Sequence, residues 1–391
     1  MTEALSHLKV LDLSRILAGP WASQTLADLG ADVIKIERPN SGDDTRRWGP
    51  PFMRDAEGET TQESAYFMAA NRGKRSVCLD ITAPKDQQTL RQLAQDCDIV
   101  IENFKVGGAK KYGLDYASLS KINPKLIYCS ITGFGQTGPY SHRPGYDFLV
   151  QAMGGLMSVT GEKDGEPGAG PQKVGVALTD IMTGLYATVG ILAALAEREK
   201  SGLGQQVDLA LLDVTAATLA NQATNVLVGE QLPTRLGNAH PNIVPYQSFA
   251  TRDGHCIIAV GNDDQFKRFC ALLELSHLSD DDKFATNQAR VLHREQLVPL
   301  LEKAMLTHTR DHWLTCCEAA GVPAGPINTI DEVFNNEQIL HRQMRINVPH
   351  PLNPELELPG NPIKLSRTPV SYCRPPPMLG EHTDEVLKST K

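Results

Sequence analysis

Asp180 is the residue whose type and position best suit covalent chemistry. Apolar residues follow it at helical spacing, namely Ile181, Leu185, Val189, Leu192 and Leu195. This spacing predicts a buried helix with Asp180 in its first turn and Thr179 as a possible N-cap. Because a helix N-terminus favours negative charge, we expect the carboxylate to stay ionised, as a nucleophile toward an acyl group must be. The alternative is a purely capping aspartate, which local pattern alone would favour.

A group of cations lies near predicted loops, although the formal net charge of the protein is -8. Cations gathered at loops of an acidic protein favour a phosphate-binding pocket over a solvated basic surface. The predicted phosphate ligands are Arg38, Arg72, Lys74, Arg75 and Lys111.

Strands and helices that would position these residues alternate along the first half of the chain. Strands are predicted at 9–14, 32–36, 75–80, 98–101 and 126–132, and helices at 19–29, 84–96, 116–120 and 180–199. This alternation predicts an α/β fold with a mostly parallel sheet, whose ligands bind beyond the carboxyl ends of the strands. The segments expected at those ends are Arg15–Ala18, which includes Leu17, then Glu37–Arg38, Glu102–Phe104, which includes Asn103, and Gly133–Gly135, which includes Phe134.

Residues 133–138 match the G-x-G-x-x-G pattern after a predicted strand. We do not interpret this match as a dinucleotide site, because Pro139 follows directly, no helix opens there, and the first β-α-β unit lacks these glycines. The glycines more plausibly let the backbone approach an acyl group or a helix.

Composition changes after residue 228, where Gly, Pro and Asn become frequent. A predicted hairpin at 246–260 and helices at 264–274, 289–305 and 310–320 indicate a second, smaller α+β domain. We predict a large domain over residues 1–225, a small domain with its linkers over 226–328, and a C-terminal segment over 329–391 that returns to the large domain. A long helix is expected at 213–227.

Several classes of protein are disfavoured. The acidic balance argues against a nucleic-acid binder. No apolar run is judged long enough to span a membrane, and the first predicted strand begins too early for a signal peptide, so a cytoplasmic location is expected. The cysteines and histidines show no metal-ligand spacing, so no metal site is expected.

The sequence resembles the class III CoA-transferases over nearly the whole chain. The resemblance is carried by residues 10–20, 29–38, 42–46, 71–76, 102–104, 130–136 and 379–383, together with Asp180. It implies a Rossmann-like large domain built from both chain ends, a small domain, and two subunits interlocked as a homodimer. Coenzyme A esters are then substrates, and no tightly bound cofactor is expected.

The resemblance also implies roles for individual residues. Asp180 would attack the acyl-CoA thioester and pass through a mixed anhydride to an aspartyl-CoA thioester. Arg38 and the loop at 72–75 would contact the CoA nucleotide, and Asn103, Phe104 and Lys111 would line its adenosine and diphosphate site. Residues 133–136 would lie near the acyl centre.

Within this family, residues 46–51, 128–133, 239–247 and 374–377 are most similar to the succinate–hydroxymethylglutarate (glutarate) CoA-transferases. The substrates implied are succinyl-CoA as donor and glutarate or a hydroxylated relative as acceptor. Leu17 stands where formyl-CoA transferases carry glutamine, and residues 237–240 replace their glycine run. Both departures disfavour oxalate and formyl-CoA as substrates.

A dicarboxylate acceptor needs a cation for its distal carboxylate, since burying that charge unpaired is costly. Arg46, Arg47 and His240 are the predicted partners, and Tyr146 is also placed at the substrate site. On spacing alone, structural ion pairs of the two arginines with Asp43 or Asp44 are as well supported.

Other functions are compatible with the same fold. An acyl-CoA racemase or epimerase of the same fold would use a His and Asp pair to move a proton α to the thioester. A non-catalytic CoA-binding protein would have lost its nucleophile, and a nicotinamide oxidoreductase would need the missing glycine fingerprint. The context of Asp180 favours the transferase.

Overall fold

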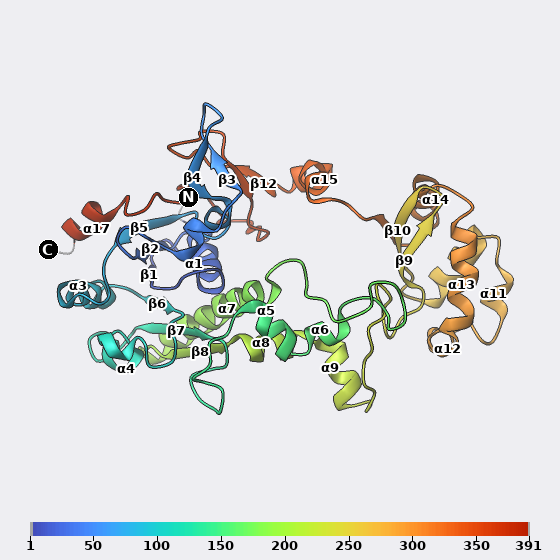
Figure 1. The fold of residues 1–391 in the computed structure, drawn as a ribbon, viewed down its shortest axis with the longest axis horizontal. Helices are drawn as coiled ribbons and strands as arrows, with labels where there is room; N and C mark the ends of the chain where they lie inside the picture. The colour runs from blue at the N-terminus through green and yellow to red at the C-terminus, as the bar shows by residue number, and fades with distance from the viewer. Residues whose placement is uncertain (1–2, 390–391) are drawn as a thin grey trace. The chain divides into compact units, whose positions relative to one another are not determined.

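The computed structural model describes residues 3–389 of the chain (Figure 1). The chain divides into two compact units. The first unit comprises Met1–Leu156, Val174–Ala220 and Glu337–Lys391, and the second comprises Met157–Lys173 and Asn221–Asn336. The C-terminal segment therefore joins the large unit, from residue 337 rather than 329. The short segment 157–173, which is rich in Gly and Pro, belongs to the small unit.

A parallel sheet forms the centre of the first unit, with every neighbouring pair of strands parallel. Its strand order is β5–β2–β1–β6–β7–β8. The bounds are β1 Lys9–Asp12, β2 Asp32–Glu37, β5 Lys74–Cys78, β6 Ile99–Glu102, β7 Ile127–Thr132 and β8 Gln206–Ala210. The chain runs outward from β1 to β5 and then returns to β6 on the other side of β1. The strand order thus reverses between β1 and β6, which is where such sheets bind ligands.

Alternating residues of the central strands enter different hydrophobic clusters. Val10 of β1 and Ile99 of β6 pack with α1 (Ala18–Asp28), α7 (Leu178–Ser201) and α8 (Leu211–Thr218). Leu11 and Val100, the next residue of each strand, pack instead with α3 (Pro84–Gln95), α4 (Tyr116–Leu119) and α17 (Thr383–Ser389). Successive side chains of a strand point to opposite faces, so these strands are apolar on both.

Helix α7 carries Asp180 and is longer and more apolar than expected. Among the described residues, it is the helix whose length and composition would suffice to cross a membrane, contrary to the prediction that no apolar run is long enough. In this structure α7 packs on α1 in the core of the first unit. Gly184 permits this contact, since a Cβ atom there would lie 2.7 Å from the carbonyl oxygen of Ala18. Helices approach this closely only where a small residue stands at the crossing.

Several further elements of the described chain carried no clear sequence signal. They are the 3-10 helices η1 Asp44–Arg47 and η2 Lys110–Tyr112, the hairpin of β3 Phe52–Arg54 and β4 Thr60–Ser64, helices α2 Ala65–Met68, α5 Asp147–Met153, α6 Leu156–Val159, α15 Ile330–Asn335 and α16 Glu337–His341, and the strand pair β12 Arg345–Asn347 and β13 Glu357–Pro359. Most are one turn or a few residues long, below the length at which periodicity is informative.

The C-terminal segment is anchored to the sheet of the first unit. The amide of His382 donates to the carbonyl of Ser76 in β5, and the amide of Gly73 donates to the carbonyl of Arg374. Val386 of α17 is fully buried against the sheet. These contacts show how the C-terminal segment returns to the first unit.

The second unit has its own antiparallel sheet and core. The strands β9 (Tyr246–Thr251), β10 (Gly254–Ala259) and β11 (Ala324–Pro326) pair in the order β11–β10–β9. Around the core residues Phe249, Phe266 and Trp313 lie α10 (Asp263–Leu272), α11 (His277–Asp280), α12 (Asn287–Leu292), α13 (Arg294–Met305) and α14 (Arg310–Ala320).

Two predicted long helices are interrupted. The helix expected at 213–227 is divided into α8 and α9 (Ala220–Leu227), because Ala220 adopts a φ of 46° that no helix interior accommodates. The helix expected at 289–305 is divided into α12 and α13 at His293.

Candidate active site

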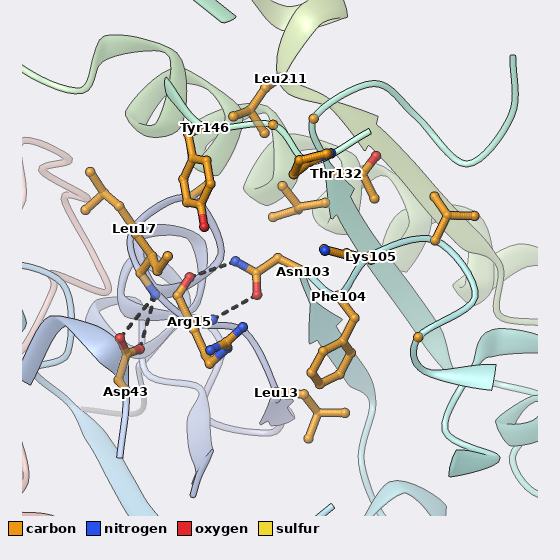
Figure 2. A pocket seen from close by; sticks show the side chains of 18 of the residues that line it. Leu13, Arg15, Leu17, Asp43, Asn103, Phe104, Lys105, Thr132, Tyr146 and Leu211 are labelled. Atoms are coloured by element: carbon orange, nitrogen blue, oxygen red, sulfur yellow. Dashed lines mark hydrogen bonds between the residues drawn. The ribbon is translucent and has the colours of Figure 1, made fainter. Parts of the chain in front are cut away.

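A pocket of about 480 Å³ lies in the first unit, beyond the carboxyl ends of β1 and β6. The loop after β1 contributes Arg15 to Ala18, and the loop after β6 contributes Asn103 to Val106. The segment after β7 adds Gly133 and 143–146, and Asp180 of α7 lies in the same wall. The pocket therefore occupies the point where the strand order reverses. Figure 2 shows side chains that line it, among them Arg15, Leu17 and Asn103.

The two loops that open the pocket are tied to each other. The side-chain oxygen of Asn103 accepts a hydrogen bond from the amide of Arg15 at 2.9 Å, and its nitrogen donates to the carbonyl of Arg15 at 2.7 Å. Both bonds are drawn in Figure 2. Such a reciprocal pair fixes the separation of the loops, because neither can shift without losing both bonds.

Ile16 adopts a backbone conformation that is unusual for a β-branched residue. Its φ is 73°, in the left-handed region. Its amide donates to both carboxylate oxygens of Asp43 at 3.2 Å, and the buried Lys35 holds the same carboxylate at 2.9 Å. Burial would raise the pKa of Asp43, but Lys35 and the Thr45 backbone lower it to about 2. This anionic anchor holds the loop in a strained shape against the pocket.

The cations of the pocket wall are partly different from those predicted. Arg15 and Arg38 both pair with Asp44, at 2.5 Å and 2.8 Å, and their side chains are 37% and 48% exposed. Lys105 and Arg143 also line the pocket, and the guanidinium of Arg143 lies 4.1 Å from the ring centre of Tyr140. The charged side chains of these four residues are therefore placed to bind a phosphate or a carboxylate in the pocket.

Asp180 lies in the first turn of α7, as its sequence context predicts, but its charge state differs from the expectation. Burial, and then the neighbouring carboxylate of Asp147, raise the pKa of Asp180 to about 7. The helix N-terminus does not keep this carboxylate strongly acidic, because desolvation disfavours the charged form. Nor does Thr179 cap the helix: its hydroxyl lies 3.0 Å from that of Thr215, and its amide donates to Asp147.

The pocket lining includes eight of the residues predicted for the site. They are Leu17, Ala18, Arg38, Asn103, Phe104, Gly133, Tyr146 and Asp180. Arg15, Lys105, Arg143 and the strained Ile16 join them without having been predicted as ligands. The described lining contains no histidine.

The cationic loop at 72–75 does not contribute to the pocket, and its predicted contact with the nucleotide does not fit this arrangement. Arg72 is buried and pairs with Asp28 at 2.6 Å. Lys74 is fully buried and pairs with Asp12 at 3.2 Å, and Arg75 pairs with Asp32 at 2.5 Å. Each of these cations already has a carboxylate partner within the fold, and removing one member of a buried pair would leave the other charge unpaired.

Arg46 is likewise structural. It pairs with Glu37 at 2.8 Å and with Glu63 at 3.0 Å, and it stacks 3.7 Å from the ring centre of Phe67. The alternative of a structural ion pair is therefore correct for Arg46, although its partners are glutamates rather than Asp43 or Asp44. Arg47 is exposed and lies outside the pocket lining.

The remaining predicted residues also lie outside the described lining. Lys111 is exposed and lies 5.4 Å from the ring centre of Tyr112, which does line the pocket. Phe134, Gly135 and Gln136 belong to the loop after β7, but only Gly133 of this run reaches the pocket. His240 belongs to the second unit, where its ring lies 5.3 Å from that of Tyr246.

Asp147 lies outside the pocket lining, but it contacts the start of α7 and was not predicted from the sequence. It opens α5, and its carboxylate accepts hydrogen bonds from the start of α7. The spacing of four residues between Asp147 and Gln151 suits a contact on one helix face, but it is a weak signal for a functional residue. No local sequence pattern relates Asp147 to Asp180, which lies 33 residues later. Within residues 3–389 no cluster of three or more His, Cys, Asp or Glu side chains is arranged to hold a metal.

Comparisons with known proteins agree with this geometry. The model of "CoA-transferase family III" matches residues 5–383. The chain is 51% identical over 389 residues to a succinate–glutarate CoA-transferase of Agrobacterium fabrum, covering 98% of this chain and 94% of that protein. It is 43% identical over 384 residues to the human succinyl-CoA:glutarate CoA-transferase, covering 98% and 85%.

A solved structure gives the same result for the fold. The crystal structure of a CAIB/BAIF family protein from Brucella suis superimposes with a TM-score of 0.87 at 50% identity, covering 100% of both chains. The resemblance inferred from the sequence motifs is confirmed, and this protein belongs to CoA-transferase family III.

Proposed function

We propose that this enzyme transfers CoA from succinyl-CoA to glutarate or a closely related dicarboxylate, with Asp180 as the nucleophile. The observation that carries the proposal is that Asp180 shares one pocket with the loops at the strand-order reversal. The similarity to proteins named as succinate–glutarate transferases supports this choice of acids.

The chemistry runs through the side chain of Asp180 in two symmetrical halves. Its carboxylate attacks the thioester carbonyl of succinyl-CoA and expels the CoA thiolate, leaving a mixed anhydride. The thiolate attacks the aspartyl carbonyl, which releases succinate and forms the aspartyl-CoA thioester. Glutarate then attacks that thioester, and the thiolate released attacks the glutaryl carbonyl. Glutaryl-CoA forms and the Asp180 carboxylate is restored.

The nucleotide of CoA would occupy the part of the pocket formed by the loops after β2 and β6. Arg38 and Lys105 offer charge to its phosphates, and Phe104 offers an apolar face to the adenine. Lys105 thus takes the role that the resemblance assigned to Lys111, because it lies in the pocket lining and Lys111 does not.

Arg143 is the cation that we assign to the distal carboxylate of the acceptor. It lines the same pocket as Asp180 and Tyr146, whereas Arg46 is committed to two glutamates. A guanidinium matches a carboxylate through two parallel hydrogen bonds, which a monoacid substrate would leave unmade.

The experiment that tests the transferase function is direct. Purified enzyme is incubated with succinyl-CoA and glutarate, and glutaryl-CoA is followed by mass spectrometry together with the intact protein. We expect glutaryl-CoA to accumulate, and hydroxylamine to trap Asp180 during turnover. Asp180→Ala should lose transfer while keeping its circular dichroism spectrum. Substantial transfer by Asp180→Ala would refute the covalent role.

A second experiment tests the choice of acceptor. Glutarate and its monoacid analogue valerate are compared by kcat/KM in the wild type and in Arg143→Gln. We expect strong preference for glutarate in the wild type and loss of that preference in the variant, with the KM for succinyl-CoA little changed. Equal kcat/KM for the two acids would refute the dicarboxylate assignment. A raised KM for succinyl-CoA alone would move Arg143 to the CoA site.

The described pocket also bears on the racemase alternative. The His and Asp pair that proton transfer at Cα requires is not found in its lining, which contains no histidine. The carboxylate that acts on Asp180 from outside the lining is Asp147. Wash-in of deuterium at Cα of a chiral acyl-CoA would nevertheless identify that activity directly, and we expect none.

We further propose that the enzyme is a homodimer. Large apolar side chains are exposed on α5 and α7, including Phe148 at 58% and Val189 at 63%. Exposed apolar patches of this kind are typical of subunit interfaces. Light scattering coupled to size-exclusion chromatography should give twice the chain mass, and a monomer at micromolar concentration would contradict the proposal.

A further inference from the structure

The backbone that enters α7 has no cap of its own. The N-cap position is Ala177, whose side chain has no polar atom, and residues 174–177 before it are in neither helix nor strand. The first amides of a helix have no partner within the helix and must find one elsewhere. The residue that projects from this uncapped turn is Asp180.

Helix α5 supplies the missing cap from a distant part of the chain. Oδ1 of Asp147 accepts a hydrogen bond from the amide of Thr179 at 2.9 Å and a longer one from the amide of Asp180 at 3.4 Å. A carboxylate that accepts from these amides fixes the orientation of the first turn. The position from which the Asp180 side chain reaches the pocket is therefore set by Asp147.

Gln151, one turn further along α5, holds both Asp147 and the segment before α7. Its side-chain nitrogen donates to Oδ2 of Asp147 at 2.7 Å, and its oxygen accepts from the amide of Val174 at 2.9 Å. Gln151 is fully buried, so these hydrogen bonds are shielded from water. The two α5 side chains, spaced by one helical turn, act as a clamp on residues 174–180. On the opposite side, the hydroxyl of Thr215 in α8 meets that of Thr179.

The clamp also brings a negative charge to the start of α7. The N-terminal end of a helix carries a partial positive charge, which would stabilise an ionised Asp180. The Asp147 carboxylate lies at that end and opposes the effect. Tyr66 of α2 is a second titratable group that interacts with Asp180. The other charged side chains that line the same pocket are Glu37, Asp43, Arg15, Arg38, Lys105 and Arg143.

We propose that Asp147, held by Gln151, is a positioning residue for Asp180 that fixes the first turn of α7 and opposes the helix dipole there. The inference rests on the proposed function in so far as Asp180 is the nucleophile. A carboxylate that binds its proton more tightly is the stronger nucleophile once ionised, which suits attack on a thioester. Burial and Asp147 together raise the pKa of Asp180 to about 7, in agreement with this role.

The first test is kinetic and uses Asp147→Asn, which keeps one acceptor oxygen for the amide of Thr179, removes the oxygen that accepts from Gln151, and removes the charge. The wild-type kcat/KM should rise with pH through about 7, as Asp180 ionises. In Asp147→Asn this rise should move to lower pH by about one unit, with the KM for succinyl-CoA little changed. Asp147→Ala and Gln151→Met, which loosen the turn, should lower kcat at least tenfold. Asp213→Asn, in the exposed first turn of α8, is the matched control and should leave the profile unchanged.

The second test needs no substrate, so it separates this inference from the proposed reaction. Melting temperatures are measured for the wild type, Asp147→Asn, Asp180→Asn and the double variant at pH 5 and pH 8. At pH 8 Asp180→Asn should raise the melting temperature, and the rise should be smaller when Asp147 is already neutral. At pH 5 Asp180 is protonated, so Asp180→Asn should raise the melting temperature only slightly, both in the wild-type background and in Asp147→Asn.

The outcomes of the two tests are distinguishable. If glutarate transfer fails but the melting temperatures show coupling at pH 8, the proposed function is wrong and the action of Asp147 on Asp180 stands. If the Asp180→Asn effect at pH 8 is the same in both backgrounds, or the pH profile of Asp147→Asn matches that of the wild type, the inference is overturned.

Discussion

Asn103 and the backbone of Arg15, 88 residues apart in the chain, exchange two hydrogen bonds of 2.9 Å and 2.7 Å. The pair joins the loop after β1 to the loop after β6, on either side of the point where the sheet reverses its strand order. The side-chain amide of Asn103 therefore fixes the distance between these two loops of the pocket. Leu13, the first residue after β1, still donates from its amide to the carbonyl of Ile101 in β6, and beyond it the side chain of Asn103 connects the two loops.

Asn103→Ala should weaken binding of acyl-CoA. It removes both hydrogen bonds, each worth roughly 0.5–1.5 kcal/mol, so we expect the KM for succinyl-CoA to rise about tenfold with a smaller fall in kcat. Steady-state kinetics measure both. Asn123→Ala is the matched control, since Asn123 also donates to backbone carbonyls, at Ala94 and Cys97, but outside the pocket. Equal effects of the two variants on KM would contradict the assignment.

Arg38 and Arg72 should respond differently to removal of their charge. Arg72→Ala leaves Asp28 buried without its ion-pair partner, which costs about 3–5 kcal/mol of unfolding free energy. Arg38 is half exposed, so Arg38→Ala should leave urea unfolding nearly unchanged and raise the KM for succinyl-CoA. A stable Arg72→Ala enzyme with a raised KM would restore the role first predicted for that loop.

Glu102 should make the protein less stable as the pH rises. This carboxyl group is 4% exposed at the end of β6, and burial raises its pKa to about 7 from 4.5. Between these values the folded state binds more protons than the unfolded state, so stability falls as pH increases from about 4.5 through 7. The loss is roughly 1.4 kcal/mol for each unit of pKa difference.

Glu102→Gln tests this dependence by urea unfolding, because the amide keeps an oxygen for the amide of Phe104. Relative to the wild type, the variant should gain stability at pH 8 and change little at pH 5. A gain that is independent of pH would show that Glu102 does not titrate in this range.

Gly184→Ala should disturb both stability and catalysis. Its new methyl group would lie 2.7 Å from the carbonyl oxygen of Ala18 and 3.0 Å from Cβ of Trp21, so α1 and α7 must separate. We expect a loss of about 1–3 kcal/mol of unfolding free energy and a lower kcat, since Ala18 of α1 and Asp180 of α7 both line the pocket. Gly190→Ala in the same helix meets only a methyl of Val207 and should be better tolerated. The reverse order of stability would contradict this account of the helix contact.

The sequence alone determined the parts of this protein that depend on local pattern. Apolar runs and turn residues predicted β1, β2, β5, β6 and β7 within a few residues of their observed bounds. The central strands of a parallel sheet are covered on both faces, so their segments are rich in apolar residues. Helical spacing after Asp180 placed that residue in the first turn of α7. The motifs spread over the chain identified the family, since they record which residues this fold and chemistry require.

Only the tertiary structure decided which charges are available to a ligand. Arg72 meets Asp28 across 44 residues of chain, and Lys74 meets Asp12 across 62, so neither pair is visible as a local spacing. A buried cation and a ligand-binding cation have the same residue type, and what distinguishes them is the carboxylate that folding brings beside them. The same holds for Asp180: its raised pKa comes from burial and from Asp147, both of which exist only after α5 has packed against α7.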